Sequence, residues 1–310
     1  MRELRPSVAL ARLAQALPPS VRENVTVIGS VAAGFHFESE NAPTEVRTKD
    51  IDCVLAPYLK AVGAGTQIAA ELIAHGWRPS LERPPGNAVT PDNELPVIRL
   101  YPPTGEDWFV ELLGVPLAPG VPGTSWSRIS LKSGDFGLPS FPYLGIATHR
   151  PTVTDWGISC GRVEMMALAH LLEHPELTPQ LISKQIDDRK IKRCNKDLGR
   201  VLALAYLTPE REMESWPTQW IEALQSVLGA GWQEAANRVP HGVRALLESS
   251  EELEQAWFAN NVGLLAGRGV SLEATGVAGE RLMADVVSRF SEMAVGASRG
   301  YGGRRNVGDP

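Results

Sequence analysis

Short apolar runs separated by proline and glycine fill residues 1–160, whereas apolar positions recur at helical spacing from Gly161 onward. Apolar runs stand at 24–30 and 51–55, and residues 96–115 hold two more around a Pro-Pro-Thr-Gly turn. Runs of this length that end in turn residues are typical of strands. The pattern also predicts a helix over roughly 60–75, closed by Gly76, and loops with one or two short strands over 115–160.

The second half has the periodicity of helices. Apolar side chains follow helical spacing over 161–174, and further helices are expected near 178–207, 217–228, 239–248 and 271–295. We therefore expect an α/β (α+β) domain over residues 1–160 and an all-helical domain over 161–295. The glycine-rich, polar residues 296–310 are expected to form a flexible tail.

Composition limits the classes of protein that the chain can be. Its 310 residues are 43% hydrophobic and 21% charged, with a net charge of −6, which suits a soluble protein with a real core and gives no global basic footprint for nucleic acid. Three widely spaced cysteines form neither a disulfide framework nor a zinc knuckle, so a cytoplasmic location is expected. The first 24 residues are not typical of a signal peptide, and no apolar stretch is long enough for a membrane span.

Two carboxylates interrupt one of the predicted strands. Asp50 and Asp52 stand two positions apart in the segment RTKDIDCVL. Successive strand side chains point to opposite faces, so these two project from the same side, where their like charges repel each other. A divalent cation between them would offset that repulsion. Mg²⁺ is typically held in this way, by one or two carboxylates together with substrate phosphates.

Partners for such a site lie on either side of the acidic strand. Gly29 and Ser30 end the run 24–30, and the residues that follow can begin a helix, whose N-terminus is a ready anion site. Downstream, Glu111 lies inside the apolar run DWFVELLGV, where it could supply a third carboxylate. Asp107, four residues earlier on the same face, is the alternative third acid.

The three segments together resemble the polymerase-β-type nucleotidyltransferase superfamily, which has a Gly-Ser turn, an Asp-x-Asp strand and a third acid on a neighbouring strand. The motif Arg-Thr-x-Asp-Ile-Asp most resembles the AbiEii-type branch, whose members are known as toxins of abortive-infection and toxin–antitoxin systems. The resemblance covers residues 20–115 well and continues faintly to about 207. It implies a nucleotidyltransferase domain with a mixed sheet, followed by a helical domain.

The resemblance also implies roles for individual residues. Gly29 and Ser30 would hold nucleotide phosphates. Asp50, Asp52 and Glu111 would be catalytic and would bind Mg²⁺, with two ions possible, and Glu111 could activate an incoming hydroxyl. The further residues expected to contact the nucleotide are Arg47, Lys49, Arg193, Lys196 and Asp197.

A basic segment over 184–200 carries seven basic and three acidic residues in an acidic chain. Spacings of three and four residues would place Arg189, Arg193, Lys196 and Arg200 on one helical face. That face is either solvated or a clamp for triphosphate or RNA, including tRNA, and the resemblance adds an antitoxin protein as a potential partner. The histidines show no metal-ligand spacing, and His170 and His174 are interpreted as structural.

The chain departs from the branch in two respects, which keep other functions open. Nineteen residues separate Ser30 from Asp50, which implies an inserted loop, and the lysine expected near Met165 or Met166 is missing, although Lys132, Lys184 or Lys190 could replace it. One alternative is a small-molecule nucleotidyltransferase of the aminoglycoside type. The other is a degenerate homologue that binds a nucleotide or a protein partner without turnover.

Overall fold

The structure is a computed structural model that describes residues 2–39, 45–80, 82–174, 181, 186 and 188–302, with the backbone alone for residues 2 and 298–302. The chain forms two compact units. The α/β unit comprises residues 1–166 and 262–267, and the helical unit comprises residues 167–261 and 268–310. The first crossing between the units lies six residues after the boundary expected from the sequence, and a short later segment returns to the α/β unit.

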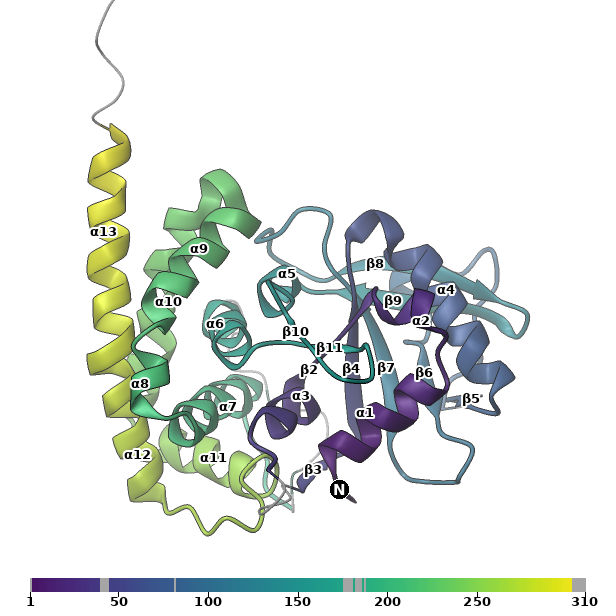
Figure 1. The fold of residues 1–310 in the computed structure, drawn as a ribbon, viewed down its shortest axis with the longest axis horizontal. Helices are drawn as coiled ribbons and strands as arrows, with labels where there is room; N and C mark the ends of the chain where they lie inside the picture. The colour runs from purple at the N-terminus through teal and green to yellow at the C-terminus, as the bar shows by residue number, and fades with distance from the viewer. Residues whose placement is uncertain are drawn as a thin grey trace, which may run out of the picture. The chain divides into compact units, whose positions relative to one another are not determined.

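The α/β unit is built on a seven-stranded sheet (Figure 1). In spatial order its strands are β10 (Thr152–Val153), β11 (Ser159–Cys160), β2 (Val25–Ile28), β4 (Asp50–Leu55), β7 (Phe109–Gly114), β6 (Arg99–Tyr101) and β5 (Arg78–Pro79). Strand β4 runs antiparallel to β2 and parallel to β7, whereas β6 runs antiparallel to β7. The expected α/β class and mixed sheet are therefore confirmed.

Helices pack on this sheet because their apolar faces match its core. Helices α3 (Gly29–His36) and α4 (Tyr58–Ala74) contact its strands directly, whereas α1 (Pro6–Gln15) packs on α3 and α2 (Pro19–Arg22) packs on α4. Leu144 of the short helix α5 (Leu144–Ala147) joins a core cluster with Val54 of β4. Helix α4 buries Ala61, Ile68 and Leu72, and Gly65 lets it approach closely, since a Cβ there would lie 2.9 Å from Leu55. As the sequence predicts, α4 ends just before Gly76, whose φ of +85° favours glycine.

The two faces of β4 have different environments. Ile51, Cys53 and Leu55 alternate on one face and are almost completely buried in the core. Asp50 and Asp52 lie on the other face and are partly exposed. Alternation thus keeps the acidic pair off the face that Ile51 and Leu55 bury, while Val54, further along the acidic face, is itself buried.

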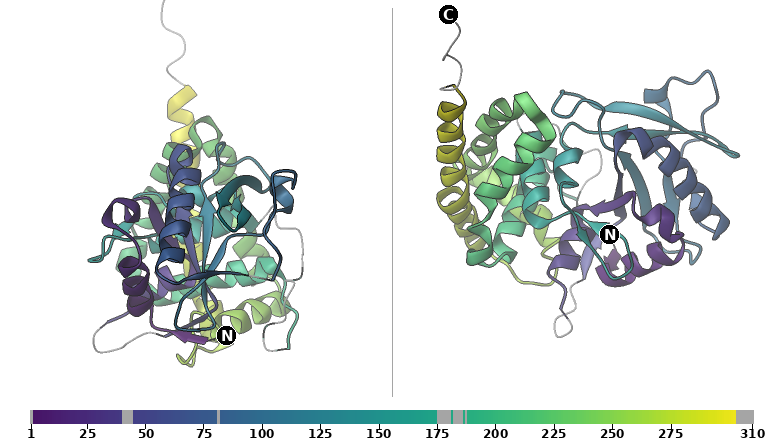
Figure 2. Two further views of the ribbon diagram at one scale, coloured as in Figure 1. Left: turned by 90° about the vertical axis from the view of Figure 1, so that its right-hand side faces the viewer. Right: turned by 45° about the horizontal axis from the view of Figure 1, so that its top comes forward.

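Residues 115–160 contain more regular structure than the sequence predicts. Strands β8 (Ser125–Leu131) and β9 (Gly134–Ser140) pair over seven residues each and form a long hairpin that packs along α4 (Figures 1 and 2). The sequence suggested only loops and short strands here because serines, glycines and a proline interrupt the apolar pattern. A second small sheet pairs β1 (Arg2–Leu4) with β3 (Val46–Thr48).

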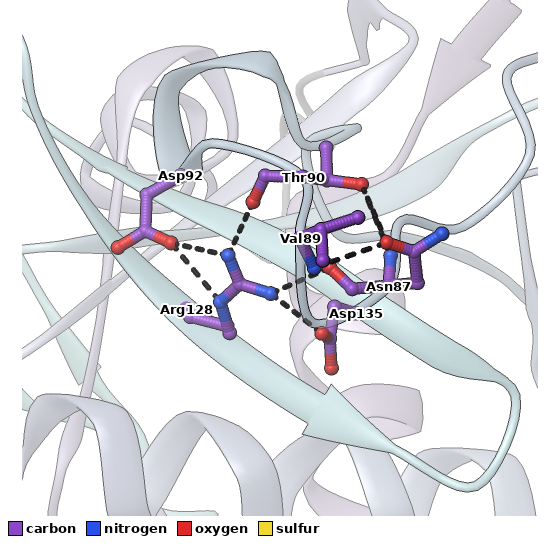
Figure 3. A network of polar contacts seen from close by, with 6 residues as sticks. All are labelled: Asn87, Val89, Thr90, Asp92, Arg128 and Asp135. Carbon is purple, nitrogen blue, oxygen red and sulfur yellow. Dashed lines mark hydrogen bonds and ion pairs between the residues drawn. The ribbon is translucent and has the colours of Figure 1, made fainter.

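Arg128 fixes the loop before β6 onto this hairpin (Figure 3). Its guanidinium donates to Asp92 Oδ1 from Nε at 3.0 Å and to Asp135 Oδ2 from Nη1 at 2.6 Å, and it also donates to the backbone oxygens of Asn87 and Thr90. The short 3₁₀ helix η1 (Asp92–Glu94) begins at one of these partners. One side chain therefore binds both the hairpin and the loop over residues 87–92.

The helical unit contains more helices than the sequence predicts. They are α7 (Arg193–Leu207), α8 (Glu210–Met213), α9 (Trp216–Leu228), α10 (Trp232–Leu247), α11 (Ser250–Asn261), α12 (Leu272–Arg281) and α13 (Ser288–Gly302), with a 3₁₀ turn, η3 (Gly229–Gly231), and a π-helical segment, η4 (Leu282–Val287). Helix α6 (Val163–Glu173) leads into the unit from the α/β side. Trp220 is fully buried and meets Phe290 edge-on at 5.5 Å in the unit's core.

Two of the expected helical boundaries are wrong. The helix expected over 178–207 begins at Arg193, because an Ile186–Arg189 bridge and a positive φ at Asp188 interrupt helical geometry before it. Residues 175–180, 182–185 and 187 lie outside the described residues. Helix α13 continues to Gly302, into the segment expected to be a tail, and the remainder, 303–310, is also outside the described part. Among the described residues, no helix is both long and apolar enough to cross a membrane.

Candidate functional site

The predicted acidic residues meet the predicted Gly-Ser turn in one row across the sheet. Ile28, the last residue of β2, pairs with Asp52 on β4, and Asp52 pairs with Glu111 on β7. Paired residues of neighbouring strands project from the same face, and adjacent strands lie about 4.8 Å apart. The register therefore places Asp52 between the start of α3 and Glu111, and Asp50 on the same face one position along β4.

Gly29 is required by its contact with Asp52. It has a φ of +73°, and a Cβ added there would lie only 2.7 Å from Asp52 Oδ2. Any other residue would be strained by the backbone and would push the carboxylate aside. Because Gly29 is the first residue of α3, the N-terminus of that helix, with its unpaired backbone N–H groups, begins beside that carboxylate.

Asp50 is held by a neighbour on the preceding strand. The hydroxyl of Thr48, at the end of β3, donates to Asp50 Oδ1 at 2.5 Å. Thr48 is buried, so the donor has little freedom to move away. This contact fixes one carboxylate oxygen of the acidic pair and connects the small β1–β3 sheet to the site.

Glu111 is paired with an arginine that the sequence analysis did not select. Arg99, opposite Glu111 on β6, donates from Nε to Glu111 Oε2 at 2.6 Å, and its guanidinium also lies 5.1 Å from the centre of the Phe109 ring. Partial burial works to lower the pKa of Arg99, but the Glu111 carboxylate outweighs it and raises that pKa above its ordinary value. The third acid thus forms a close ion pair with Arg99.

The donor set on this face fits a hard divalent cation. Asp50, Asp52 and Glu111 offer only carboxylate oxygens, all three are partly exposed, and two of them stand in one row beside a helix N-terminus. The group of three carboxylates is therefore open to solvent. Among the described residues, the acids and histidines whose ligand atoms all lie within 4.8 Å of one another are in the helical unit instead, at His170, Glu173 and Asp197.

The two basic residues that precede Asp50 in the sequence, Arg47 and Lys49, each lie close to an acidic side chain. Arg47, on β3, binds Glu3 of β1 through Nη2 at 2.6 Å, and Lys49 lies 4.0 Å from Asp107. Asp107, the alternative third acid, has a side chain that is 75% exposed. It is therefore more open to solvent than Glu111, whose side chain is 18% exposed.

The predicted basic segment is not one helical face. Arg193, Lys196 and Asp197 lie on α7 in the helical unit, where Arg193 and Arg200 approach Asp197 at 3.7 and 4.0 Å. Arg189 lies before the helix, where it stacks on the Phe258 ring at 4.4 Å and pairs with Glu254 at 3.1 Å. The prediction that Arg189 shares a helical face with Arg193 and Lys196 is therefore wrong.

The position where the resemblance expects a lysine is part of the core. Met165 and Met166 on α6 are 1% and 3% exposed, which suits an apolar side chain and not an ammonium group. Of the three lysines considered as replacements, Lys184 lies outside the described residues.

Arg99 and Thr48 are the neighbours of the acids that sequence reasoning missed. Both could have been found from one signal, a polar side chain inside a strand-forming run next to an acid-bearing strand. That signal becomes specific only when the strand order is known, because Arg99 reaches Glu111 across the β6–β7 pairing.

Comparisons with models of protein families, with curated proteins and with solved structures return no match. The function must therefore be argued from the residues and their geometry.

Proposed function

We propose that the chain is a Mg²⁺-dependent nucleotidyltransferase that transfers a nucleotidyl group from an NTP to an acceptor hydroxyl or phosphate, with RNA as the favoured acceptor. One observation carries the proposal. Asp52 contacts the turn at Gly29 and stands in register with Glu111, so that three carboxylates share one sheet face beside a helix N-terminus. This is the arrangement that the sequence resemblance predicts.

Each residue has a role that its position supports. The N–H groups at the start of α3, with the Ser30 hydroxyl, would bind the triphosphate, since a helix N-terminus favours negative charge. Asp50 and Asp52 would hold Mg²⁺, which neutralises charge on the transferring and leaving oxygens when it is bound. Thr48 keeps Asp50 in place for this role through its hydrogen bond.

Glu111 would accept the proton of the acceptor hydroxyl. As the acceptor oxygen bonds to the α-phosphorus, the bond from that phosphorus to its bridging oxygen breaks and pyrophosphate leaves. Arg99 holds Oε2 of Glu111 at 2.6 Å and so orients the carboxylate for this transfer. The ion pair with Arg99 therefore orients Glu111 within the row that it shares with Asp52.

A second candidate function is a nucleotide-binding homologue without turnover. The observation that favours it is the burial of Met165 and Met166, where the resemblance expects a lysine. The two candidates predict the same nucleotide binding but differ in product formation.

Labelled NTPs supplied with Mg²⁺ and either total RNA or an aminoglycoside panel separate these functions. Label on RNA supports the leading proposal, label on an aminoglycoside supports a small-molecule acceptor, and NTP binding without transfer supports the second candidate. The variant Asp50→Asn/Asp52→Asn should abolish transfer and leave the fold intact, because it removes a repulsion. Glu23→Gln, at an exposed acid of the same unit that has no proposed role, is the matched control and should keep full activity.

A further inference from the structure

A second group of metal-ligand side chains lies in the helical unit, far along the chain from the acidic strand. A ring nitrogen of His170 and carboxylate oxygens of Glu173 and Asp197 all lie within 4.8 Å of one another. His170 and Glu173 share one face of α6 because they are three residues apart, and Asp197 belongs to α7. We call these three residues the helical-unit cluster.

His170, a member of this cluster, has a polar atom without a hydrogen-bond partner. Although part of the residue reaches the surface, its Nδ1 is buried and makes no hydrogen bond. A buried polar nitrogen without a partner costs free energy, so such atoms usually mark a bound water or ion.

Asp197 is also poorly satisfied for a buried acid. It is 5% exposed, yet within the described part of the chain its carboxylate accepts no hydrogen bond and has only two loose ion pairs, at 3.7 and 4.0 Å. Buried carboxylates normally accept several short hydrogen bonds or bind a metal. His170 and Asp197, from different helices, thus each carry a poorly satisfied polar group, and a ligand atom of one side chain lies within 4.8 Å of a ligand atom of the other.

We propose that the helical-unit cluster binds one divalent transition-metal ion, with Zn²⁺ as the representative, through His170, Glu173 and Asp197. One imidazole nitrogen and two carboxylate oxygens are a donor set for Zn²⁺, Mn²⁺, Fe²⁺ or Co²⁺, whereas the carboxylates on β4 and β7 offer the oxygen-only set that Mg²⁺ prefers. Three protein ligands leave at least one coordination position for water. The ion would join the end of α6 to α7.

The cations around the cluster set its affinity. Three cations lie near enough to His170 for an electrostatic effect: Arg193, Lys196 and Arg200. Arg193 and Arg200 also approach the Asp197 carboxylate. Their charge opposes a bound cation, so binding has to replace the two long ion pairs of Asp197. These pairs exceed the 2.7–2.9 Å of a strong charge-assisted hydrogen bond, and metal–carboxylate bonds of about 2.1 Å would be the better contacts.

The test is Zn²⁺ titration of the full chain after treatment with a chelator, followed by calorimetry at pH 7. We expect one Zn²⁺ per chain and a rise in the melting temperature with added Zn²⁺, because the ion binds the folded state alone. His170→Gln and Asp197→Asn should each weaken binding by more than the roughly 10- to 100-fold that loss of an outer-shell partner causes. Co²⁺ substitution should give a visible absorption band that the same variants lose.

His174→Gln is the matched control. His174 lies one turn after His170, and its Nδ1 is also buried without a hydrogen-bond partner. It is not part of the helical-unit cluster, so His174→Gln should bind Zn²⁺ as the unchanged chain does. Asp50→Asn/Asp52→Asn should also keep Zn²⁺ binding, which separates this proposal from the nucleotidyltransferase proposal. The inference is overturned if the chain binds no Zn²⁺ or if folded His170→Gln and Asp197→Asn bind it unchanged. Bound water would then fill the space between these side chains.

Discussion

The Arg99–Glu111 pair offers the most direct test of how the acidic face is held together. Arg99 Nε lies 2.6 Å from Glu111 Oε2, and the two side chains are 33% and 18% exposed. At an effective dielectric constant of 20, unit charges 4 Å apart attract by about 4 kcal/mol. Partial exposure and the cost of desolvating both groups reduce the net coupling, so we expect about 1–2 kcal/mol.

The assay is a double-mutant cycle in urea. The free energies of unfolding of the unchanged chain, Arg99→Met, Glu111→Gln and the double variant together give the coupling between the two side chains. Arg99→Met should be the more damaging single change, because it removes a cation 2.6 Å from the less exposed Glu111 carboxylate. Glu111→Gln removes that charge and should be tolerated better.

Added Mg²⁺ makes the same cycle report on the site. If Glu111 is a metal ligand, Mg²⁺ replaces part of the charge lost in Arg99→Met, so the stability deficit of this variant should shrink as Mg²⁺ is raised. In Glu111→Gln the effect of Mg²⁺ should be smaller. A coupling energy below about 0.3 kcal/mol, the usual error of additivity, would refute the reasoning about the pair. An Arg99→Met deficit that ignores Mg²⁺ would refute the reasoning about the metal.

Three further changes test other parts of the structure. Gly29→Ala should destabilise the chain by about 1–2 kcal/mol through its positive φ, and it should lower transferase activity further by displacing Asp52; unchanged kinetics would contradict that contact. Burial lowers the pKa of His36, so stability should fall as pH drops below about 6.5, the unfolded value, and melting curves of His36→Gln should show a flatter pH dependence. Arg128→Ala should speed proteolysis of the loop over residues 87–92 far more than Arg128→Lys does, because Lys keeps the positive charge that contacts the loop; equal cleavage of the two variants would show that this charge does not hold the loop.

Local sequence patterns predict the elements that carry the acids. The strand at Asp50 and Asp52 and the helix closed by Gly76 follow from alternation and from a glycine stop signal, both of which act over a few residues. The hairpin of β8 and β9 was underestimated because its stability comes from cross-strand pairing and from contacts with α4, which no short window of sequence contains.

The partners of the acids depend on long-range order, so the sequence alone does not single them out. Arg99 and Glu111 are twelve residues apart, and only the antiparallel register of β6 and β7 brings them together. Likewise, Arg189 has the right spacing to join a helix, but a positive φ at Asp188 places it outside α7. In both cases backbone pairing, and not residue type, decides which charges meet.

The return of residues 262–267 to the α/β unit has a consequence during synthesis. The backbone N–H of Arg47, on the strand that leads into the acidic pair, donates to the backbone oxygen of Gly263 at 3.3 Å. Domains generally fold as units while the chain emerges from the ribosome. Here the hydrogen bond of Arg47 needs a residue made more than two hundred positions later, so this contact forms only after most of the helical unit has been translated.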